Sequence, residues 1–232
     1  MKFISILFFA ILCVSFLPMN IASGDEKSTT PVKATPIKMI ILGDSLTAGY
    51  GLEEKYSFPT QLEHALQSDG IDISIINAGV SGDTTAGGLE RLAWTLDDPF
   101  SEPADILVIA LGANDGLRAV PPAFTRENLE NIITQARDIQ PSITILLIGM
   151  LAPPNLGDTY AMDFNKIYPE LAEKYDIPLY PFFLDGVITD KDLNQADGIH
   201  PNAEGVEIII GKSLPFFKTH TQSIVDKRLL AD

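Results

Sequence analysis

From Ile37 onward, apolar runs of strand length alternate with segments of helical periodicity, and this alternation restricts the fold more than any other feature. Four runs are nearly continuous in Ile, Leu, Val or Met, and a fifth is shorter. Continuous runs of this kind are typical of strands buried on both faces, as in a parallel sheet. The predicted strands are Lys38–Leu42, Ile71–Ile76, Ile106–Leu111, Ile143–Ile148 and Pro178–Tyr180.

The segments between these runs have the pattern of helices that are buried along one side. Their apolar residues recur three and four positions apart, which is the period of an amphipathic helix. Strands and helices in alternation predict an α/β layer fold with right-handed crossovers. The apolar sets are Phe58, Leu62, Ala65 and Leu66; Leu89, Leu92, Ala93 and Leu96; Leu129, Ile132, Ile133 and Ala136; Ile167, Leu171 and Tyr175; and Val206, Ile209 and Ile210.

Chain length and charge restrict the organisation and the partners. A chain of 232 residues that is 46% hydrophobic can bury one sizeable core, so one folded domain is expected. The formal net charge is -15, and such a chain is repelled by phosphate backbones and by anionic membrane surfaces. Nucleic acid is therefore excluded as a partner, and the sequence does not indicate an oligomeric state.

The N-terminus has the pattern of a secretory signal peptide. Lys2 precedes an almost wholly apolar stretch from Phe3 to Leu17, Pro18 interrupts it, and small residues follow near Ser23. The alternative is an uncleaved membrane anchor, for which the apolar run is short. We therefore predict a signal peptide over residues 1–23 and a secreted or periplasmic protein. The sequence does not distinguish cleavage after Ala22 from cleavage after Ser23.

The single cysteine, Cys13, lies inside this predicted signal peptide. Cleavage leaves no cysteine, which excludes a disulfide, a cysteine nucleophile and a Cys-ligated zinc site. Leu12 stands where a lipoprotein signal needs a small residue, so lipid anchoring is not expected. Residues 24–36 are polar and rich in Thr and Pro, which indicates a flexible linker. Residues 37–232 are the expected folded domain.

Small and polar residues follow each of the first four predicted strands. The carboxyl ends of parallel strands meet at one edge of a sheet, where ligands bind in α/β folds. We therefore expect these segments to converge on one site. They are Gly43–Thr47, Asn77–Thr84, Gly112–Gly116 and Met150–Pro154.

Ser45 and His200 are the candidate nucleophile and base, and Asp197 lies three residues before His200. A serine needs a neighbour to take its proton, and a carboxylate that orients the base completes an acyl-transfer site. Each residue has a structural alternative. Asp44 and Ser45 are suited to cap the following turn, and Asp197 is suited to cap a helix near Pro201. The other two histidines are predicted on a solvated helix face, for His64, and in a polar C-terminal tail, for His220.

Three groups are candidate donors to an oxyanion. They are the backbone N–H groups of Ser45 and Gly82 and the side-chain amide of Asn114, whose alternative role is in a tight turn. Ser81 is not the predicted nucleophile, because Asp83 replaces the last glycine of a G-x-S-x-G elbow.

Other chemistries have less support in the sequence. The glycines after the strands do not form a dinucleotide fingerprint or a phosphate-binding loop. Asp and Glu are abundant but show no metal-ligand spacing with histidine. Paired carboxylates for glycoside cleavage stay open, but no pair is singled out.

Four blocks of this chain resemble the GDSL (SGNH) hydrolases, in the order typical of that family. The blocks are Gly43-Asp44-Ser45-Leu46, Gly82 within Ser-Gly-Asp, Gly112-Ala113-Asn114-Asp115 and Asp197-Gly198-Ile199-His200. Three segments are similar to the thioesterase I, lysophospholipase L1 and arylesterase branch: Gly43–Leu52, Ala113–Arg118 and Ile167–Leu171. Ala113 stands where many relatives have a second glycine.

The resemblance implies a flavodoxin-like three-layer α/β/α sandwich with a mostly parallel five-stranded sheet. It implies Ser45 as nucleophile, His200 as base and Asp197 as its orienter. It also implies an oxyanion hole made by the Ser45 N–H, the Gly82 N–H and the Asn114 side chain, with no metal or organic cofactor.

The implied activity is hydrolysis of carboxylic esters with aryl or short acyl groups, and of acyl thioesters, through an acyl-enzyme. A small-molecule or lipid ester is then the partner. One alternative is a dedicated lysophospholipase or acyl-CoA thioesterase, and a remote one is a non-catalytic cell-envelope binding protein. In this branch the segment after the fourth strand helps to shape the acyl site, and here that segment is Leu151–Tyr160. The alternative is that this segment is an ordinary surface loop.

Overall fold

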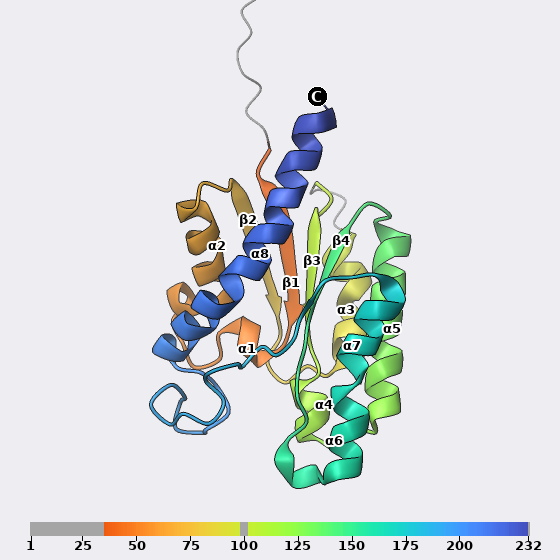
Figure 1. Cartoon of the computed structure of the whole chain (residues 1–232), viewed down its shortest axis with the longest axis vertical. Coiled ribbons are helices and arrows are strands. Elements are labelled where there is room, and N and C mark those ends of the chain that lie inside the picture. The colour runs from red at the N-terminus through yellow and green to blue at the C-terminus, as the bar shows by residue number, and fades with distance from the viewer. Residues whose placement is uncertain (1–34, 98–101, 232) are drawn as a thin grey trace, which may run out of the picture. The chain divides into compact units, whose positions relative to one another are not determined.

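The computed structural model describes residues 35–97 and 102–231, which form an α/β fold around five parallel strands (Figure 1). The strand order is β2-β1-β3-β4-β5. All five predicted strands are confirmed, with shifts of at most three residues at their ends. They are β1 Ile37–Gly43, β2 Ile73–Gly79, β3 Ile106–Ala110, β4 Thr144–Ile148 and β5 Leu179–Tyr180.

Helices cover both faces of the sheet, which gives the expected three layers. Helices α2 and α8 lie on one face, and α3, α5 and α7 lie on the other (Figure 1). Each of these five contains one of the predicted apolar sets. The helices are α1 Ser45–Ala48, α2 Phe58–Ser68, α3 Thr85–Leu96, α4 Ala113–Leu117, α5 Pro122–Ile139, α6 Asp158–Asn165, α7 Ile167–Tyr175 and α8 Ala203–Ala231, with short 3-10 turns at Glu54–Tyr56 and Pro154–Leu156.

Burial of the strands differs between the centre and the edge of the sheet. Every residue of β3 is buried, and β1 and β4 each have one partly exposed residue. The prediction of two buried faces is wrong for β2, where Ile76 is 41% exposed. The physical reason is that β2 is an edge strand, with β1 as its only neighbour in the sheet.

Helix α8 is much longer than its predicted core of Val206 to Ile210, and the prediction of a polar C-terminal tail is wrong. Buried residues continue along one side of the helix at Phe217, Thr221 and Ile224, so the same face packs on the domain beyond Pro215. His220 is partly buried against the ring of Phe216, and burial lowers the pKa of its imidazole. His64 is exposed, as predicted.

The strand order places a topological switch between β1 and β3. The chain leaves β1 toward β2 on one side and returns from β2 to β3 on the other. Loops that leave such a point diverge, and the space between them is the usual ligand site of an open α/β sheet. The segment after β1 begins with Asp44 and Ser45, and the segment after β3 leads into α4.

Ala119, directly after α4 and Arg118, has a left-handed backbone with φ of 51°. A side chain is disfavoured there by about 1–2 kcal/mol, whereas glycine is tolerated at some cost in unfolded-state entropy. We expect Ala119→Gly to raise the free energy of unfolding by about 0.5–1 kcal/mol. Urea denaturation measures it. The matched reverse change is Gly70→Ala. Gly70 has φ of 85°, and no atom lies within 4 Å of an added Cβ, so this variant is expected to lose a similar amount of stability. A loss of stability in Ala119→Gly would contradict the assignment of strain.

Candidate active site

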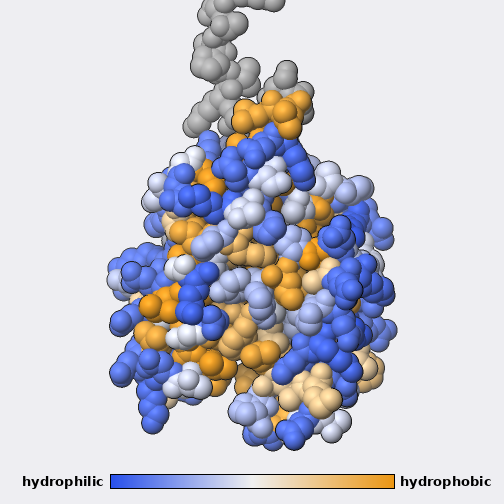
Figure 2. Space-filling model, in the orientation of Figure 1, coloured by the Kyte–Doolittle hydropathy of each residue, from blue (hydrophilic) through white to orange (hydrophobic). Residues whose placement is uncertain are grey.

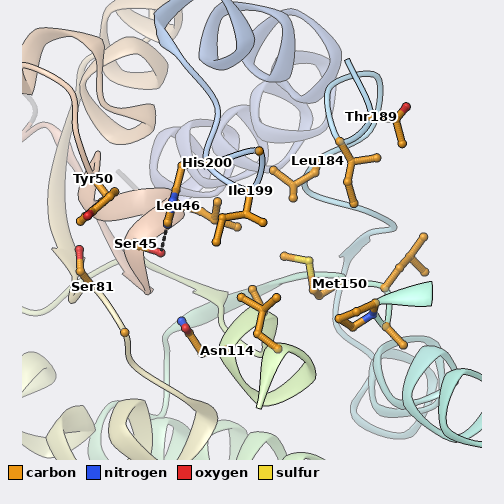
Figure 3. A pocket seen from close by; sticks show the side chains of 18 of the residues that line it. Ser45, Leu46, Tyr50, Ser81, Asn114, Met150, Leu184, Thr189, Ile199 and His200 are labelled. Carbon is orange, nitrogen blue, oxygen red and sulfur yellow. Dashed lines mark hydrogen bonds between the residues drawn. The ribbon is translucent and has the colours of Figure 1, made fainter. Parts of the chain in front are cut away.

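The end of β1 and the start of α1 position Ser45. Strand β1 ends at Gly43, and Asp44 caps α1 by accepting a hydrogen bond from the Leu46 N–H at 3.0 Å. The capping role that the sequence left open therefore belongs to Asp44. Ser45 is the first residue of α1, and its hydroxyl faces the pocket (Figure 3).

The structure brings Ser45, His200 and Asp197 together in one chain of hydrogen bonds. The distance from His200 Nε2 to Ser45 Oγ is 2.8 Å, and that from His200 Nδ1 to Asp197 Oδ2 is 2.7 Å (Figure 3 marks the first). The other carboxylate oxygen of Asp197 accepts the backbone N–H groups of Ile199 and His200 at 3.0 and 3.1 Å. Asp197 thus orients the ring and shapes the turn. The N-terminal turn of α8 is capped by the Asn202 side chain instead.

Gln195 ties the loop of His200 to the loop of Ser45. Its side-chain amide donates to the Tyr50 carbonyl at 2.7 Å and to the Pro201 carbonyl at 3.0 Å. Its backbone N–H donates to the His200 carbonyl at 2.8 Å. The Tyr50 ring also lies against the imidazole, with 4.6 Å between ring centroids. These contacts keep the imidazole of His200 beside Ser45, which lies 155 positions earlier in the sequence.

The three candidate oxyanion donors line the same pocket as Ser45 Oγ and His200. Gly82 has φ of 88°, a conformation that favours glycine. Within the described part of the chain, neither the Ser45 N–H nor the Gly82 N–H donates to another group. Asn114 lies on α4 rather than in an isolated turn, and its Nδ2 donates to the Asp83 carbonyl at 3.0 Å. An amide nitrogen has two protons, so one is left for a ligand.

The pocket is a mostly apolar cavity of about 460 Å³, within the range of about 300–1,000 Å³ usual for small-molecule sites. The segment after β4 lines it from Met150 to Pro154, so the start of the predicted Leu151–Tyr160 rim contributes to the wall. The rest of that segment forms the second 3-10 turn and the beginning of α6. Hydrophobic surface surrounds a notch at the lower edge in Figure 2, where the sheet's carboxyl edge lies in Figure 1. Other apolar lining residues are Leu46, Leu117, Leu184, Ile188 and Ile199.

The carboxylate of Asp197 is stabilised in its ionised form. The hydrogen bond with His200 lowers its pKa to about 2, and the two backbone N–H groups act in the same direction. Because the folded-state pKa lies below the ordinary value of 3.8, this interaction stabilises the fold above about pH 4 and is lost as the pH falls through about 2. Asp197 therefore stays negative from about pH 4 upward.

Asp44 has the opposite shift, because it is 1% exposed. Burial raises its pKa to about 6, despite the Leu46 hydrogen bond and the attraction of His200, which lower it. Asp115 and Asp83 add repulsion. Its second oxygen has no hydrogen-bond partner among the described residues. Ionisation of Asp44, the residue before the candidate nucleophile, therefore lowers the free energy of unfolding.

This shift makes the stability of the protein depend on pH. With a folded-state pKa of about 6 against 3.8 when unfolded, the group stabilises the fold below about pH 4, and this is lost as the pH rises through 6. We expect Asp44→Asn to gain about 2–2.5 kcal/mol in the free energy of unfolding, relative to the unsubstituted protein, between pH 4 and pH 8. Urea denaturation of both proteins at each pH measures the double difference. A difference that does not change with pH would contradict the buried, raised carboxyl.

Several side chains around these residues were not predicted from the sequence. Arg91 donates to the Gly43 carbonyl at 2.9 Å and pairs with Asp83 at 2.7 Å. Asp115, buried next to Asn114, accepts from the N–H of Thr85 at 2.8 Å and from its hydroxyl at 2.5 Å. Arg118 donates to the Gly82 carbonyl at 2.7 Å. Arg118 lies in the segment that resembles the thioesterase and arylesterase branch, and its position four residues after Asn114 places both on the same side of a helical turn.

The described residues contain no cluster of three or more His, Cys, Asp or Glu side chains suited to a metal ion. The polar groups of the pocket are a serine, an imidazole, an amide and backbone donors. These groups are suited to nucleophilic attack on a carbonyl carbon and to stabilisation of the resulting oxyanion.

Comparisons with known proteins agree with this arrangement. A family model described as GDSL-like Lipase/Acylhydrolase family matches residues 41–208. The chain is 42% identical over 167 residues to an arylesterase of Vibrio mimicus, which covers 72% of this chain and 81% of the relative. It is 39% identical over 173 residues to thioesterase 1/protease 1/lysophospholipase L1 of Escherichia coli strain K12, covering 74% of this chain and 78% of that protein.

A solved structure is also similar. The crystal structure of AlinE4, an SGNH-hydrolase family esterase, is 46% identical, with a TM-score of 0.67 over 80% of this chain and 96% of that one. The family model spans all four sequence blocks, from β1 to α8. From this match and these relatives we conclude that the chain belongs to the GDSL-like lipase/acylhydrolase family.

Proposed function

We propose that this protein is a serine esterase that hydrolyses carboxylic esters, with aryl or short acyl groups, and acyl thioesters through an acyl-enzyme on Ser45. One observation carries the proposal: Ser45 Oγ, His200 and Asp197 form a continuous hydrogen-bonded chain at the wall of an apolar pocket. The esterase and thioesterase names of relatives at about 40% identity support the class of reaction. The protein is a carboxylic ester hydrolase of this family.

The hydrogen bonds suggest how acylation proceeds. Ser45 Oγ attacks the carbonyl carbon of the ester while its proton moves to His200 Nε2. Asp197 accepts from His200 Nδ1, which leaves Nε2 free as the base and stabilises the imidazolium that forms. The tetrahedral intermediate then collapses, and the imidazolium gives its proton to the departing alcohol or thiol. A water molecule then attacks the carbonyl carbon of the acyl-enzyme while its proton moves to His200 Nε2. The second tetrahedral intermediate collapses with cleavage of the bond to Ser45 Oγ, the imidazolium returns its proton to that oxygen, and the carboxylic acid leaves.

The oxyanion of both intermediates needs donors that are already in place. We assign this role to the N–H groups of Ser45 and Gly82 and to the free proton of the Asn114 amide, which line one pocket. Loss of one such donor typically lowers kcat by about 100- to 1,000-fold. The methyl group of Ala113, where many relatives have glycine, does not block Asn114, whose amide is held at Asp83.

The apolar walls favour an acyl or aryl group as the part of the substrate that enters the cavity. Met150, Leu184 and Ile199 face the space beyond Ser45 (Figure 3). Burial of apolar substrate surface gains about 25 cal/mol per Å². Each added methylene tightens binding only until the cavity is filled, so the gain is limited to acyl groups short enough to fit inside it.

Two other functions fit parts of these observations. A dedicated lysophospholipase or acyl-CoA thioesterase would use the same three residues, and the relative named thioesterase 1/protease 1/lysophospholipase L1 supports it. A non-catalytic cell-envelope binding protein would use the pocket alone. The hydrogen bond of Ser45 to a histidine with its own carboxylate partner favours catalysis over that role.

A substrate panel tests these functions. The purified protein is assayed with p-nitrophenyl esters from acetyl to palmitoyl, with acyl-CoA, and with lysophosphatidylcholine. The proposal predicts that kcat/KM is highest for aryl esters and short acyl esters, with measurable thioester cleavage. A clear preference for lysophospholipid or acyl-CoA selects the dedicated enzyme. If no ester or thioester is cleaved, the binding-protein function replaces the proposal.

We also propose that the protein is exported, with a signal peptide over residues 1–23, a linker over 24–36 and the hydrolase domain over 37–232. Residues 1–34 lie outside the described residues, so the proposal depends on the sequence pattern. Across the described ranges, no helix combines the length and the hydropathy needed to cross a bilayer. Mass spectrometry of the N-terminus after expression in a bacterial host tests export. A periplasmic product that starts near Ser23 or Gly24 is expected, and a full-length cytoplasmic product would contradict it.

A further inference from the structure

The Gly82 N–H belongs to a β-turn whose form determines where that N–H points. The Asp83 N–H donates to the Val80 carbonyl at 3.1 Å, which closes a turn over residues 80–83. Gly82, its third residue, has φ of 88°, whereas Ser81 is not among the residues with positive φ. This is the form of a type II turn. Types I and II differ by a flip of the central peptide, which here carries the Gly82 N–H.

Two side chains, from Asn114 on α4 and from Arg118 at its C-cap, hold the two carbonyls that follow this peptide. Arg118 Nη2 donates to the Gly82 carbonyl at 2.7 Å, and Asn114 Nδ2 donates to the Asp83 carbonyl at 3.0 Å. Residues four apart lie on the same side of a helical turn. A flip between the two turn types leaves the Gly82 carbonyl nearly in place, because ψ of the third residue is about 0° in both. What the hydrogen bond from Arg118 fixes is the position of the turn relative to α4, and with it the position of the Gly82 N–H.

The guanidinium of Arg118 has no other partner among the residues that the structure describes. Three other arginines pair with carboxylates: Arg91 with Asp83, Arg126 with Glu170 and Arg228 with Asp105. Arg118 is exposed and hydrogen-bonds only to the Gly82 carbonyl. A donor with a full charge forms a stronger hydrogen bond than a neutral one, so this single contact is enough to anchor a surface turn.

We infer that Arg118 is a positioning residue for ester hydrolysis, which keeps the Gly82 N–H directed at the oxyanion. The inference rests on the proposed function. Arg118 does not touch the reacting atoms in this account; it acts through the Gly82 peptide. Because the N–H matters only once negative charge develops on the carbonyl oxygen, its loss should affect the transition state and leave substrate binding nearly unchanged.

Arg118→Met removes the hydrogen bond and keeps the apolar part of the side chain. With a neutral p-nitrophenyl ester, kcat is expected to fall by about 10- to 100-fold while KM changes by less than about 3-fold. Affinity for an alkyl boronic acid, which forms a tetrahedral adduct on the serine, should fall by a similar factor as kcat/KM. Affinity for the carboxylic acid product should stay the same. Urea denaturation checks that the variant is folded.

Arg137→Met is the matched control. Arg137 also donates from Nη2 to a backbone carbonyl, that of Tyr175, at 2.9 Å. It lies near the end of α5, at the opposite edge of the sheet from the pocket (Figure 1). Its kcat is expected to match that of the unsubstituted protein.

Three results would overturn the inference. The first is an unchanged kcat in Arg118→Met, and the second is an equal loss in Arg137→Met. The third is a loss that appears only as a raised KM for acyl-CoA, which would make Arg118 a ligand for anionic leaving groups. The Ser45→Ala variant distinguishes failure of this inference from failure of the proposed function. If Ser45→Ala is inactive and Arg118→Met is fully active, only the role of Arg118 is wrong.

Discussion

Replacement of Ser45 by alanine is expected to lower kcat/KM for a p-nitrophenyl ester by about 10,000-fold or more. The reason is chemical: His200 Nε2 lies 2.8 Å from Ser45 Oγ, and without that oxygen no acyl-enzyme can form. The donors and the pocket would still bind substrate, so a small residual rate above that of water is expected. Steady-state kinetics on the purified variant, with its fold checked by urea denaturation, measures the loss.

Ser81→Ala is the control for this experiment. Ser81 lines the same pocket and belongs to the near match to a G-x-S-x-G elbow. No hydrogen bond joins it to His200 among the described residues, and its variant should keep activity within about 3-fold of the unsubstituted protein. An active Ser45→Ala, or an inactive Ser81→Ala, would contradict the assignment of the nucleophile.

The second large effect is expected for Asp197→Asn, which should lower kcat by about 10,000-fold near neutral pH. Asp197 Oδ2 accepts from His200 Nδ1 at 2.7 Å, which leaves the other ring nitrogen free as the base. An amide that presents its NH₂ group at this position favours the opposite tautomer. Its oxygen can still accept from the Ile199 and His200 N–H groups, so the turn should persist. Activity across a pH series, with circular dichroism for the fold, measures the effect.

The pH series adds a second criterion. The pKa of Asp197 is about 2, so its titration should not contribute to any loss of activity above about pH 4. Asp192→Asn, an exposed carboxylate in the same loop, is the control and should behave like the unsubstituted protein. If Asp197→Asn retains a tenth or more of the activity, Asp197 does not have the proposed role.

Features that depend on short-range patterns were predictable from the sequence. The central strands are continuous apolar runs because both of their faces are covered, and the run that became β3 shows this directly. Edge position depends on the order of the strands, which local patterns do not encode. For this reason the exposure of Ile76 on β2 was not predicted.

The candidate site divides in the same way. The sequence predicted the candidate residues that belong to short local motifs. These are Asp197 and His200, which are three residues apart, and Ser45, Gly82 and Asn114, which follow strands. Gln195 was not predicted, since the carbonyl that it holds belongs to Tyr50, 145 residues away. The burial of Asp44 and the contact of Arg118 with Gly82 likewise arise only after the loops converge.

The central claim is that Ser45 is the nucleophile of an acyl-enzyme mechanism. A fluorophosphonate probe, followed by digestion and mass spectrometry, tests it most directly. The claim predicts a single adduct on Ser45, formed in parallel with loss of esterase activity and absent from the Ser45→Ala variant. An adduct on Ser81 or on any other residue, or full inactivation without modification of Ser45, would contradict it.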